Sequence, residues 1–174
     1  KGRQYRVSMD ENNKENCDRI DIDVLSECTL CPRMCKVDRT KNIGVCGVGY
    51  LPKLSNIVLH KGEEPPLSGE MGAGAVFFSG CQMKCIYCQN MGFSQKGIGF
   101  EISKEELSCA FLKTQRAGAT TLDLVSPTPH LPWIIGALDS ARKDGFNIPV
   151  VYNTSSYERV EILQRIEGYV DVYL

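Results

Sequence analysis

The sequence lacks any marked excess of charge and any long hydrophobic run. Its 20 Lys and Arg residues nearly balance its 21 Asp and Glu residues, which leaves a net charge of −1 at neutral pH. A chain so close to neutral has no overall field that attracts nucleic acid or an anionic membrane surface. The longest uncharged stretch, residues 124–138, contains three prolines and a histidine. It is also shorter than the roughly 20 apolar residues that a transmembrane helix needs, so it does not read as one. We therefore expect neither nucleic acid nor a membrane as a partner.

The first residues also lack the pattern of a secretory signal, and cysteine is too scarce for a disulfide scaffold. Nine cysteines in 174 residues are about 5%, below the roughly 8–10% of such scaffolds, and an odd number cannot all pair. The hydrophobic content of 43% and the charged content of 24% are ordinary for a globular domain. These features predict a cytoplasmic protein whose clustered cysteines are reduced and bind metal.

Composition divides the chain into three parts, of which the first two contain little regular structure. Residues 1–27 are polar and are expected to be a weakly ordered lead-in, with one short packed element near residues 20–25. Residues 28–72 are a Cys-rich segment followed by a Pro- and Gly-rich linker, in which we expect a strand at residues 55–59. The Cys-rich segment has too few apolar residues to fold by itself, so we expect bound metal to stabilise it.

The third part, residues 73–174, alternates short apolar runs with amphipathic stretches of helical period. The expected strands cover residues 75–78, 121–125, 148–152 and 170–174. The helices between them are expected to begin at a capping box of Ser103 and Glu106, at Pro132, and at a second capping box of Ser155 and Glu158. This order predicts an α/β fold with a parallel sheet and right-handed crossovers, the start of a partial (β/α) barrel that is truncated after strand four.

Three cysteines directly follow the first of these strands. Cys81, Cys85 and Cys88 have the spacing Cys-x3-Cys-x2-Cys, and parallel α/β folds place their chemistry in the loops after strand carboxyl ends. Three thiolates can hold three irons of a [4Fe–4S] cluster and leave the fourth iron open to a substrate. The alternative is a structural zinc site that needs a fourth ligand, for which His130 is the candidate.

A second group of cysteines lies nearer the amino terminus. Cys28, Cys31, Cys35 and Cys46 form a four-ligand set, which would make a closed site that is either structural or electron-relaying. Four thiolates suit zinc and an iron–sulfur cluster equally, and reduced cysteines without a ligand are the third possibility. Cys109 stands alone in an expected helix and is predicted to be a small buried apolar residue.

The triplet, with Tyr87 before its last cysteine, resembles the signature of radical S-adenosylmethionine (SAM) enzymes. Phe78-Ser79-Gly80 before it and Gln89-Asn90 after it resemble the pyruvate formate-lyase activating enzyme family, in particular a poorly characterised branch with an extra amino-terminal cysteine motif. Other segments that match the pattern of this branch are residues 28–35, 44–47, 60–65, 124–130 and 151–155. The resemblance therefore covers about residues 28–174.

The resemblance implies a partial barrel of the radical SAM type, with a [4Fe–4S] cluster on Cys81, Cys85 and Cys88 and SAM chelated to the fourth iron. One electron from a flavodoxin or ferredoxin-type donor would cleave SAM to a 5′-deoxyadenosyl radical, which abstracts hydrogen from a substrate such as a glycyl-radical protein. The radical is on the cofactor, so no side chain is expected to be catalytic. The residues expected to contact SAM are Tyr87, Ser126, Thr128, Asn153, Thr154 and Ser155.

Two loops depart from the family pattern. Residues 126–129 read Ser-Pro-Thr-Pro where many members have Gly-Gly-Glu, and residues 153–156 lack the Asp that activating enzymes have there. Because the expected barrel stops after strand four, we expect these 174 residues alone to bind SAM weakly. The alternative to an enzyme is a non-catalytic module that binds zinc or an iron–sulfur cluster and contacts a partner through the Cys-rich segment.

Overall fold

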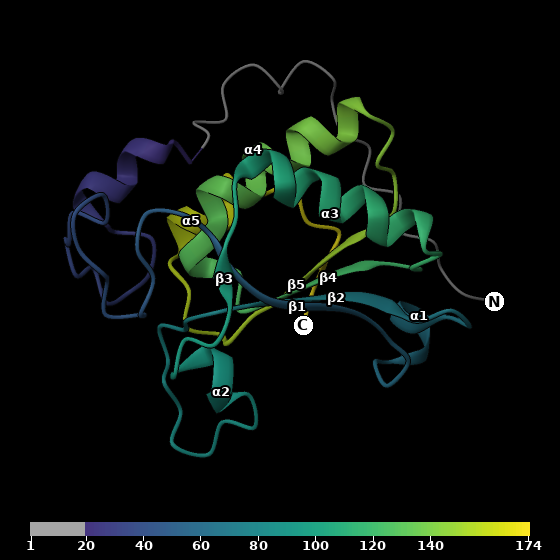
Figure 1. Ribbon diagram of the computed structural model, residues 1–174, viewed down its shortest axis with the longest axis horizontal. Helices are drawn as coiled ribbons and strands as arrows, with labels where there is room; N and C mark the ends of the chain where they lie inside the picture. Colours follow the sequence, from purple (N-terminus) through teal and green to yellow (C-terminus); the bar gives the residue numbers. More distant parts are fainter. Residues whose placement is uncertain (1–19) are drawn as a thin grey trace.

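Residues 20–174, which the computed structural model describes, form a six-stranded sheet with the two longest helices packed on one face (Figure 1). Most of the lead-in expected at residues 1–27 lies outside the described part. The strands are β1 (Lys53–His60), β2 (Ala73–Phe78), β3 (Phe100–Glu101), β4 (Leu122–Val125), β5 (Val150–Asn153) and β6 (Val172–Tyr173). The helices are α1 (Pro65–Ser68), α2 (Met91–Ser94), α3 (Lys104–Arg116), α4 (Leu131–Lys143) and α5 (Val160–Arg165), with 3-10 helices η2 (Ile22–Glu27) and η3 (Thr128–His130). None of the helices in this part of the chain is long and apolar enough to cross a membrane.

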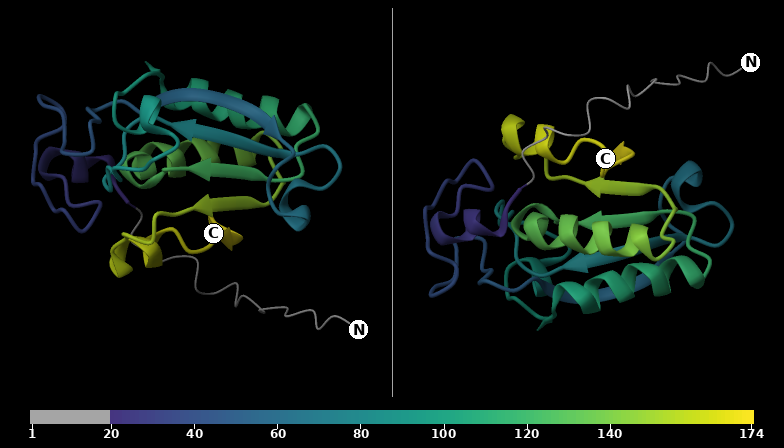
Figure 2. Two further views of the ribbon diagram at one scale, coloured as in Figure 1. Left: turned by 90° about the horizontal axis from the view of Figure 1, so that it is seen from below. Right: turned by 90° about the horizontal axis from the view of Figure 1, so that it is seen from above.

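The strand order is β3-β1-β2-β4-β5-β6, and the left view of Figure 2 shows the strands in front of the helices. β2, β4, β5 and β6 are parallel, which confirms the expected α/β class. β1 confirms the strand expected at residues 55–59, which the structure extends to residues 53–60, and it is antiparallel to both β2 and β3. A strand signal says nothing of which strand it pairs with, because pairing is decided by packing against neighbours.

α3 and α4 lie together over one face of the sheet (Figure 1). The capping box predicted for α3 is formed, since Ser103 Oγ accepts the Glu106 N–H at 3.1 Å and Glu106 Oε2 accepts the Ser103 N–H at 2.8 Å. Cys109 lies on the exposed side of α3, so the prediction that it is buried was wrong. The helix turns its neighbours Leu107 and Ser108 inward instead.

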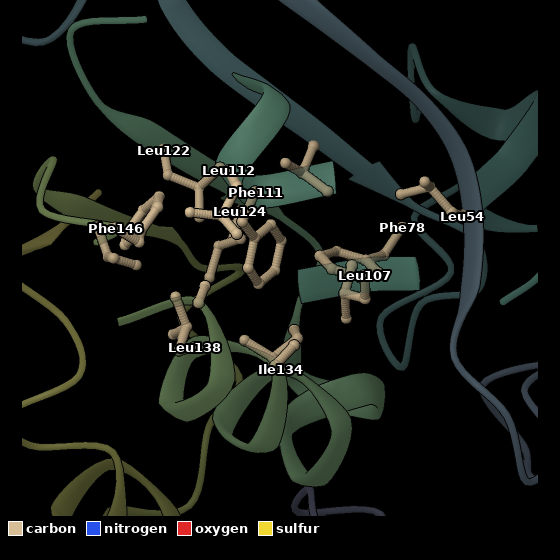
Figure 3. Packing of buried hydrophobic residues seen from close by; sticks show 14 of the residues in the cluster. Leu54, Phe78, Leu107, Phe111, Leu112, Leu122, Leu124, Ile134, Leu138 and Phe146 are labelled. Atoms are coloured by element: carbon tan, nitrogen blue, oxygen red, sulfur yellow. The ribbon is translucent and has the colours of Figure 1, made fainter. Parts of the chain in front are cut away.

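The main core lies between these two helices and the sheet (Figure 3). Alternate strand residues point toward the helices because side chains alternate across a strand. The buried members include Phe78, Leu122 and Leu124 of the strands and Leu107, Phe111, Ile134 and Leu138 of the helices. Each such side chain contributes roughly 1.5–3 kcal/mol when fully buried, so this cluster stabilises the packing of the two helices on the sheet.

The Cys-rich segment and η2 pack against the remaining side of α4 and against β5 and α5. The expected packed element near residues 20–25 is present, with Leu25 fully buried in η2. The second cluster contains Ile20, Leu25, Cys28, Leu30, Leu131, Ile135, Tyr152, Ile162 and Ile166. The Cys-rich segment therefore has an apolar anchor on the rest of the fold, which its own composition did not indicate.

The second capping box predicted from Ser155 and Glu158 is not formed, and that prediction was wrong. α5 begins at Val160, with Arg159 at its N-cap and no side-chain cap. Glu158 instead accepts hydrogen bonds from Thr128 and Thr154. The Glu158 carboxylate is therefore hydrogen-bonded to threonine hydroxyls of the loops after β4 and β5 and does not cap the backbone N–H groups at the start of α5.

Candidate metal and cofactor site

The triplet loop, residues 81–88, leaves the carboxyl end of β2 and leads into α2. Its three thiols are free and partly exposed: Cys81, Cys85 and Cys88. The Gln95 side chain donates to the carbonyl oxygen of Cys85 at 2.6 Å, and Ser94 Oγ lies 3.3 Å from Cys88 Sγ. These contacts hold the loop from the side of α2 and leave the thiols accessible.

Gln82, between the first two cysteines, ties the triplet loop to two other loops. Its side chain is only 2% exposed. Its Nε2 atom is within hydrogen-bond distance of three oxygens: Thr128 Oγ1 at 3.0 Å, Ser155 Oγ at 3.3 Å and Glu158 Oε1 at 3.3 Å. Because the carboxyl ends of β2, β4 and β5 meet at one edge of the sheet, a single amide reaches all of these groups. Sequence reasoning missed Gln82, which carries no local signal of these distant partners.

Glu158 is the acceptor at the centre of this buried polar network. Thr128 Oγ1 lies 2.9 Å from both carboxylate oxygens, and Thr154 Oγ1 donates to Oε1 at 3.0 Å. Burial raises the pKa of Glu158, and hydrogen bonds from Thr128 and Thr154 offset part of that rise. The Tyr152 hydroxyl lies 2.9 Å from Thr128 Oγ1, and burial also raises the pKa of this tyrosine. The network therefore fixes the loops after β4 and β5 relative to each other.

The residues expected to contact SAM lie at this edge but differ in their surroundings. The hydroxyls of Thr128, Thr154 and Ser155 all take part in the network around Gln82 and Glu158. Ser126 turns the chain after β4 with a φ of 58°, and Asn153 ends β5 with its side chain near Asp123. Tyr87 is 86% exposed, so its ring packs little against the rest of the described chain.

His130, the candidate fourth ligand for zinc, is fully buried and engaged elsewhere. Its Nε2 lies 2.9 Å from the carbonyl oxygen of Ser79, and its ring stacks on Phe78 with centroids 4.9 Å apart. Burial, helped by the guanidinium of Arg39, lowers the pKa of His130 to about 3. The neutral ring therefore donates Nε2–H to the Ser79 carbonyl and is a structural residue.

The four amino-terminal cysteines line one small hollow, together with Arg39 and Pro129. Burial raises the pKa of both Cys31 and Cys46, and neighbouring thiols add to the rise. Cys35 differs: burial acts in the same sense, but hydrogen bonds from backbone N–H groups, including that of Val37, outweigh it and lower the pKa. The fold thus gathers the members of the expected four-ligand set around one space.

The two cysteine groups touch through their backbones. The Cys81 N–H donates to the carbonyl oxygen of Cys46 at 3.0 Å. Gly80 permits this approach, because a Cβ there would lie 2.4 Å from Val48 Cγ2 and 2.9 Å from the Cys46 oxygen, and its φ is +88°. Two motifs that are far apart in the sequence therefore form one continuous region at the carboxyl edge of the sheet.

The positions of the thiols in the two cysteine groups affect which kind of metal centre each group can bind. Within residues 20–174, no three His, Cys, Asp or Glu side chains converge on the position of a single ion. Binding one tetrahedral zinc at either group therefore requires thiols to rotate inward. A cluster receives each thiolate on a different iron, so its ligands need not converge on one point.

Comparison with known proteins finds similarity to a protein of Methanocaldococcus jannaschii described as "Uncharacterized protein MJ0674". The two are 33% identical over 160 residues, which cover 87% of this chain and 45% of the relative. The chain thus spans a little under half of the relative's length. No family model matches the chain. No solved structure matches it.

Proposed function

We propose that this chain is the cluster- and SAM-binding part of a radical SAM iron–sulfur enzyme. The observation that carries the proposal is the junction at Gln82, which joins the triplet loop to the loops after β4 and β5. Those are the loops to which the resemblance assigns SAM contacts. The partners proposed with it are a flavodoxin or ferredoxin-type electron donor and a substrate such as a glycyl-radical protein.

The triplet loop suits a group that takes three thiolates and keeps one position open. The three thiols are partly exposed at the sheet edge, and His130 is held by Ser79 and Phe78. A [4Fe–4S] cluster with SAM on its open iron supplies one-electron cleavage of SAM and hydrogen abstraction. The protein's own part is to orient these groups and to exclude water.

Individual side chains then have definable roles. The Ser94 hydroxyl, 3.3 Å from Cys88 Sγ, can donate to that thiolate, and hydrogen bonds to cluster sulfurs tune the reduction potential. Gln82 and Glu158 hold the surrounding loops at a fixed separation. Tyr87, exposed on the triplet loop, is free to stack on the adenine of SAM.

Anaerobic reconstitution with iron and sulfide tests the proposal. We expect a coloured protein whose visible absorption changes when SAM is added. In Cys85→Ala the SAM-responsive cluster should be lost, because three thiolates are already one short of full ligation. Cys109→Ala is the matched control, since this exposed thiol lies on α3 and belongs to neither cysteine group, and it should keep the response.

Two outcomes would contradict the proposal. One is a SAM-responsive cluster in Cys85→Ala. The other is a colourless protein that holds zinc at both cysteine groups, which would favour the non-catalytic binding module.

A further inference from the structure

Arg39 is a buried cation that pairs with no carboxylate of residues 20–174. It is 1% exposed. Its Nε donates to the carbonyl oxygen of Gly49 and its Nη1 to that of Pro129, both at 2.8 Å, while Nη2 has no hydrogen-bond partner. None of the ion pairs formed within residues 20–174 includes Arg39. A guanidinium stays protonated even when buried, so an unbalanced one is strongly destabilising.

The groups closest to this guanidinium that can become anionic are thiols. Nη1 lies 3.9 Å from Cys28 Sγ. The stem of Arg39 and the Cys46 sulfur flank the same small space beside Gly44, where a Cβ would lie 3.8 Å from Arg39 Cδ and 3.3 Å from Cys46 Sγ. Arg39 also lines the hollow shared by all four amino-terminal cysteines. Protonated thiols cannot balance its charge, whereas four thiolates outnumber the charge of one divalent ion and leave a net negative centre.

We propose that Cys28, Cys31, Cys35 and Cys46 bind a metal as thiolates and that Arg39 is the buried counter-charge of this anionic centre. The thiols rotate toward the hollow to reach the metal, and the unpartnered Nη2 then faces a negative charge. Zinc and an iron–sulfur cluster share this chemistry. The centre does not depend on SAM cleavage at the triplet, so its test is separate from that of the proposed function.

Two arginines link the four-cysteine centre to neighbouring loops by hydrogen bonds. Arg39 holds the Pro129 carbonyl in the loop after β4. Arg33, between two of the four cysteines, donates from Nε to the Gln82 carbonyl oxygen at 2.6 Å. Metal binding at the four cysteines therefore orders groups that contact both neighbouring loops.

The experiment measures metal at the four cysteines alone. In the full 174-residue chain, Cys81, Cys85 and Cys88 are replaced by Ser, and metal affinity is measured by competition with a chelator. Arg39→Met is expected to weaken metal binding about 10–100-fold, the range seen when a partner of metal ligands is removed. Arg116→Met, an exposed arginine on α3, is the matched control and should leave the affinity unchanged.

Two arms distinguish the metals. In one the chain is loaded with zinc in air, and in the other with iron and sulfide under anaerobic conditions. Stoichiometric zinc or a stoichiometric cluster supports the proposal, and the metal with the higher affinity identifies the centre. Failure to retain either metal overturns it.

A purely structural role of Arg39 gives different results. Arg39→Met should lower the stability of the metal-loaded protein more than that of the metal-free protein, because the hydrogen bonds to Gly49 and Pro129 are lost in both forms but only the loaded centre carries the negative charge that Arg39 balances. An equal loss of thermal stability with and without metal would overturn the counter-charge role. Arg39→Lys and Arg39→Gln provide a second comparison if the Met variant does not fold. Lys should bind metal more tightly than Gln because it keeps the charge, and equal affinities would likewise overturn the role.

Discussion

Asp123 lies in the middle of β4 and points away from α3 and α4, since its neighbours Leu122 and Leu124 point toward them. It is 1% exposed, and neither carboxylate oxygen has a hydrogen-bond partner of good geometry. Burial raises the pKa of Asp123 from 3.8 to about 6, and the negative charge of Glu63 is the second, smaller cause of this rise. A hydrogen bond with the Asn153 side chain offsets only part of it. The ionised side chain therefore destabilises the folded state.

The size and sign of this cost follow from the pKa difference. A rise of about two pKa units corresponds to about 3 kcal/mol. Below about pH 4 the carboxyl is protonated in the folded and unfolded states and costs nothing. Between about pH 4 and pH 6 the folded state holds more protons than the unfolded state, so the free energy of unfolding falls as the pH rises. Above pH 6 the full cost is present.

Asp123→Asn removes the charge with little change of shape. We expect it to raise the free energy of unfolding by about 3 kcal/mol more at pH 7.5 than at pH 4. Urea unfolding of both proteins at the two pH values measures this, and comparison with the parent cancels other titrating groups. Asp144→Asn, at an exposed position after α4, is the control for the loss of a surface carboxylate and is unfolded at the same two pH values. Equal effects of Asp123→Asn at both pH values would refute the reasoning.

Four further predictions concern the region where the two cysteine groups meet and the N-terminal cap of α3. Gly80→Ala would place a Cβ against Val48 and the Cys46 carbonyl at a positive φ, so urea unfolding should show a loss of about 1–3 kcal/mol; unchanged stability would mean that this approach is not close. Gln82→Leu leaves Glu158 with fewer donors, so stability should fall by about 1–3 kcal/mol and the reconstituted cluster should lose its response to SAM. Cys28→Ser and Cys46→Ser should each lower the melting temperature of metal-loaded protein more than that of metal-free protein, and equal shifts in both forms would show that these thiols bind no metal. Ser103→Ala breaks the capping box and should cost about 1 kcal/mol in thermal or urea unfolding, whereas Ser156→Ala, at an exposed loop position, should cost less.

Local patterns account for the elements that sequence reasoning predicted correctly. The capping box at Ser103, the apolar periods of α3 and α4 and the runs that became β2, β4 and β5 depend on neighbours within a few residues. The cysteine spacings are also local, and the two groups of metal ligands inferred from them stay a prediction. These features were sufficient to predict the parallel βαβ units and the position of the cysteine triplet directly after β2.

Interactions between distant segments were decided only by the tertiary structure. Glu158 has the spacing of a capping residue, yet it accepts from Thr128 because β4 and β5 end side by side. The pairing of β1 with β2 and the contact of Cys46 with Cys81 have the same origin. The sequence alone determined where the cysteines lie along the chain and most of the stretches that form helices and strands, since those properties are local. The meeting of the two cysteine groups, the network at Gln82 and the burial of Arg39 depend on packing across tens of residues, which no local pattern encodes.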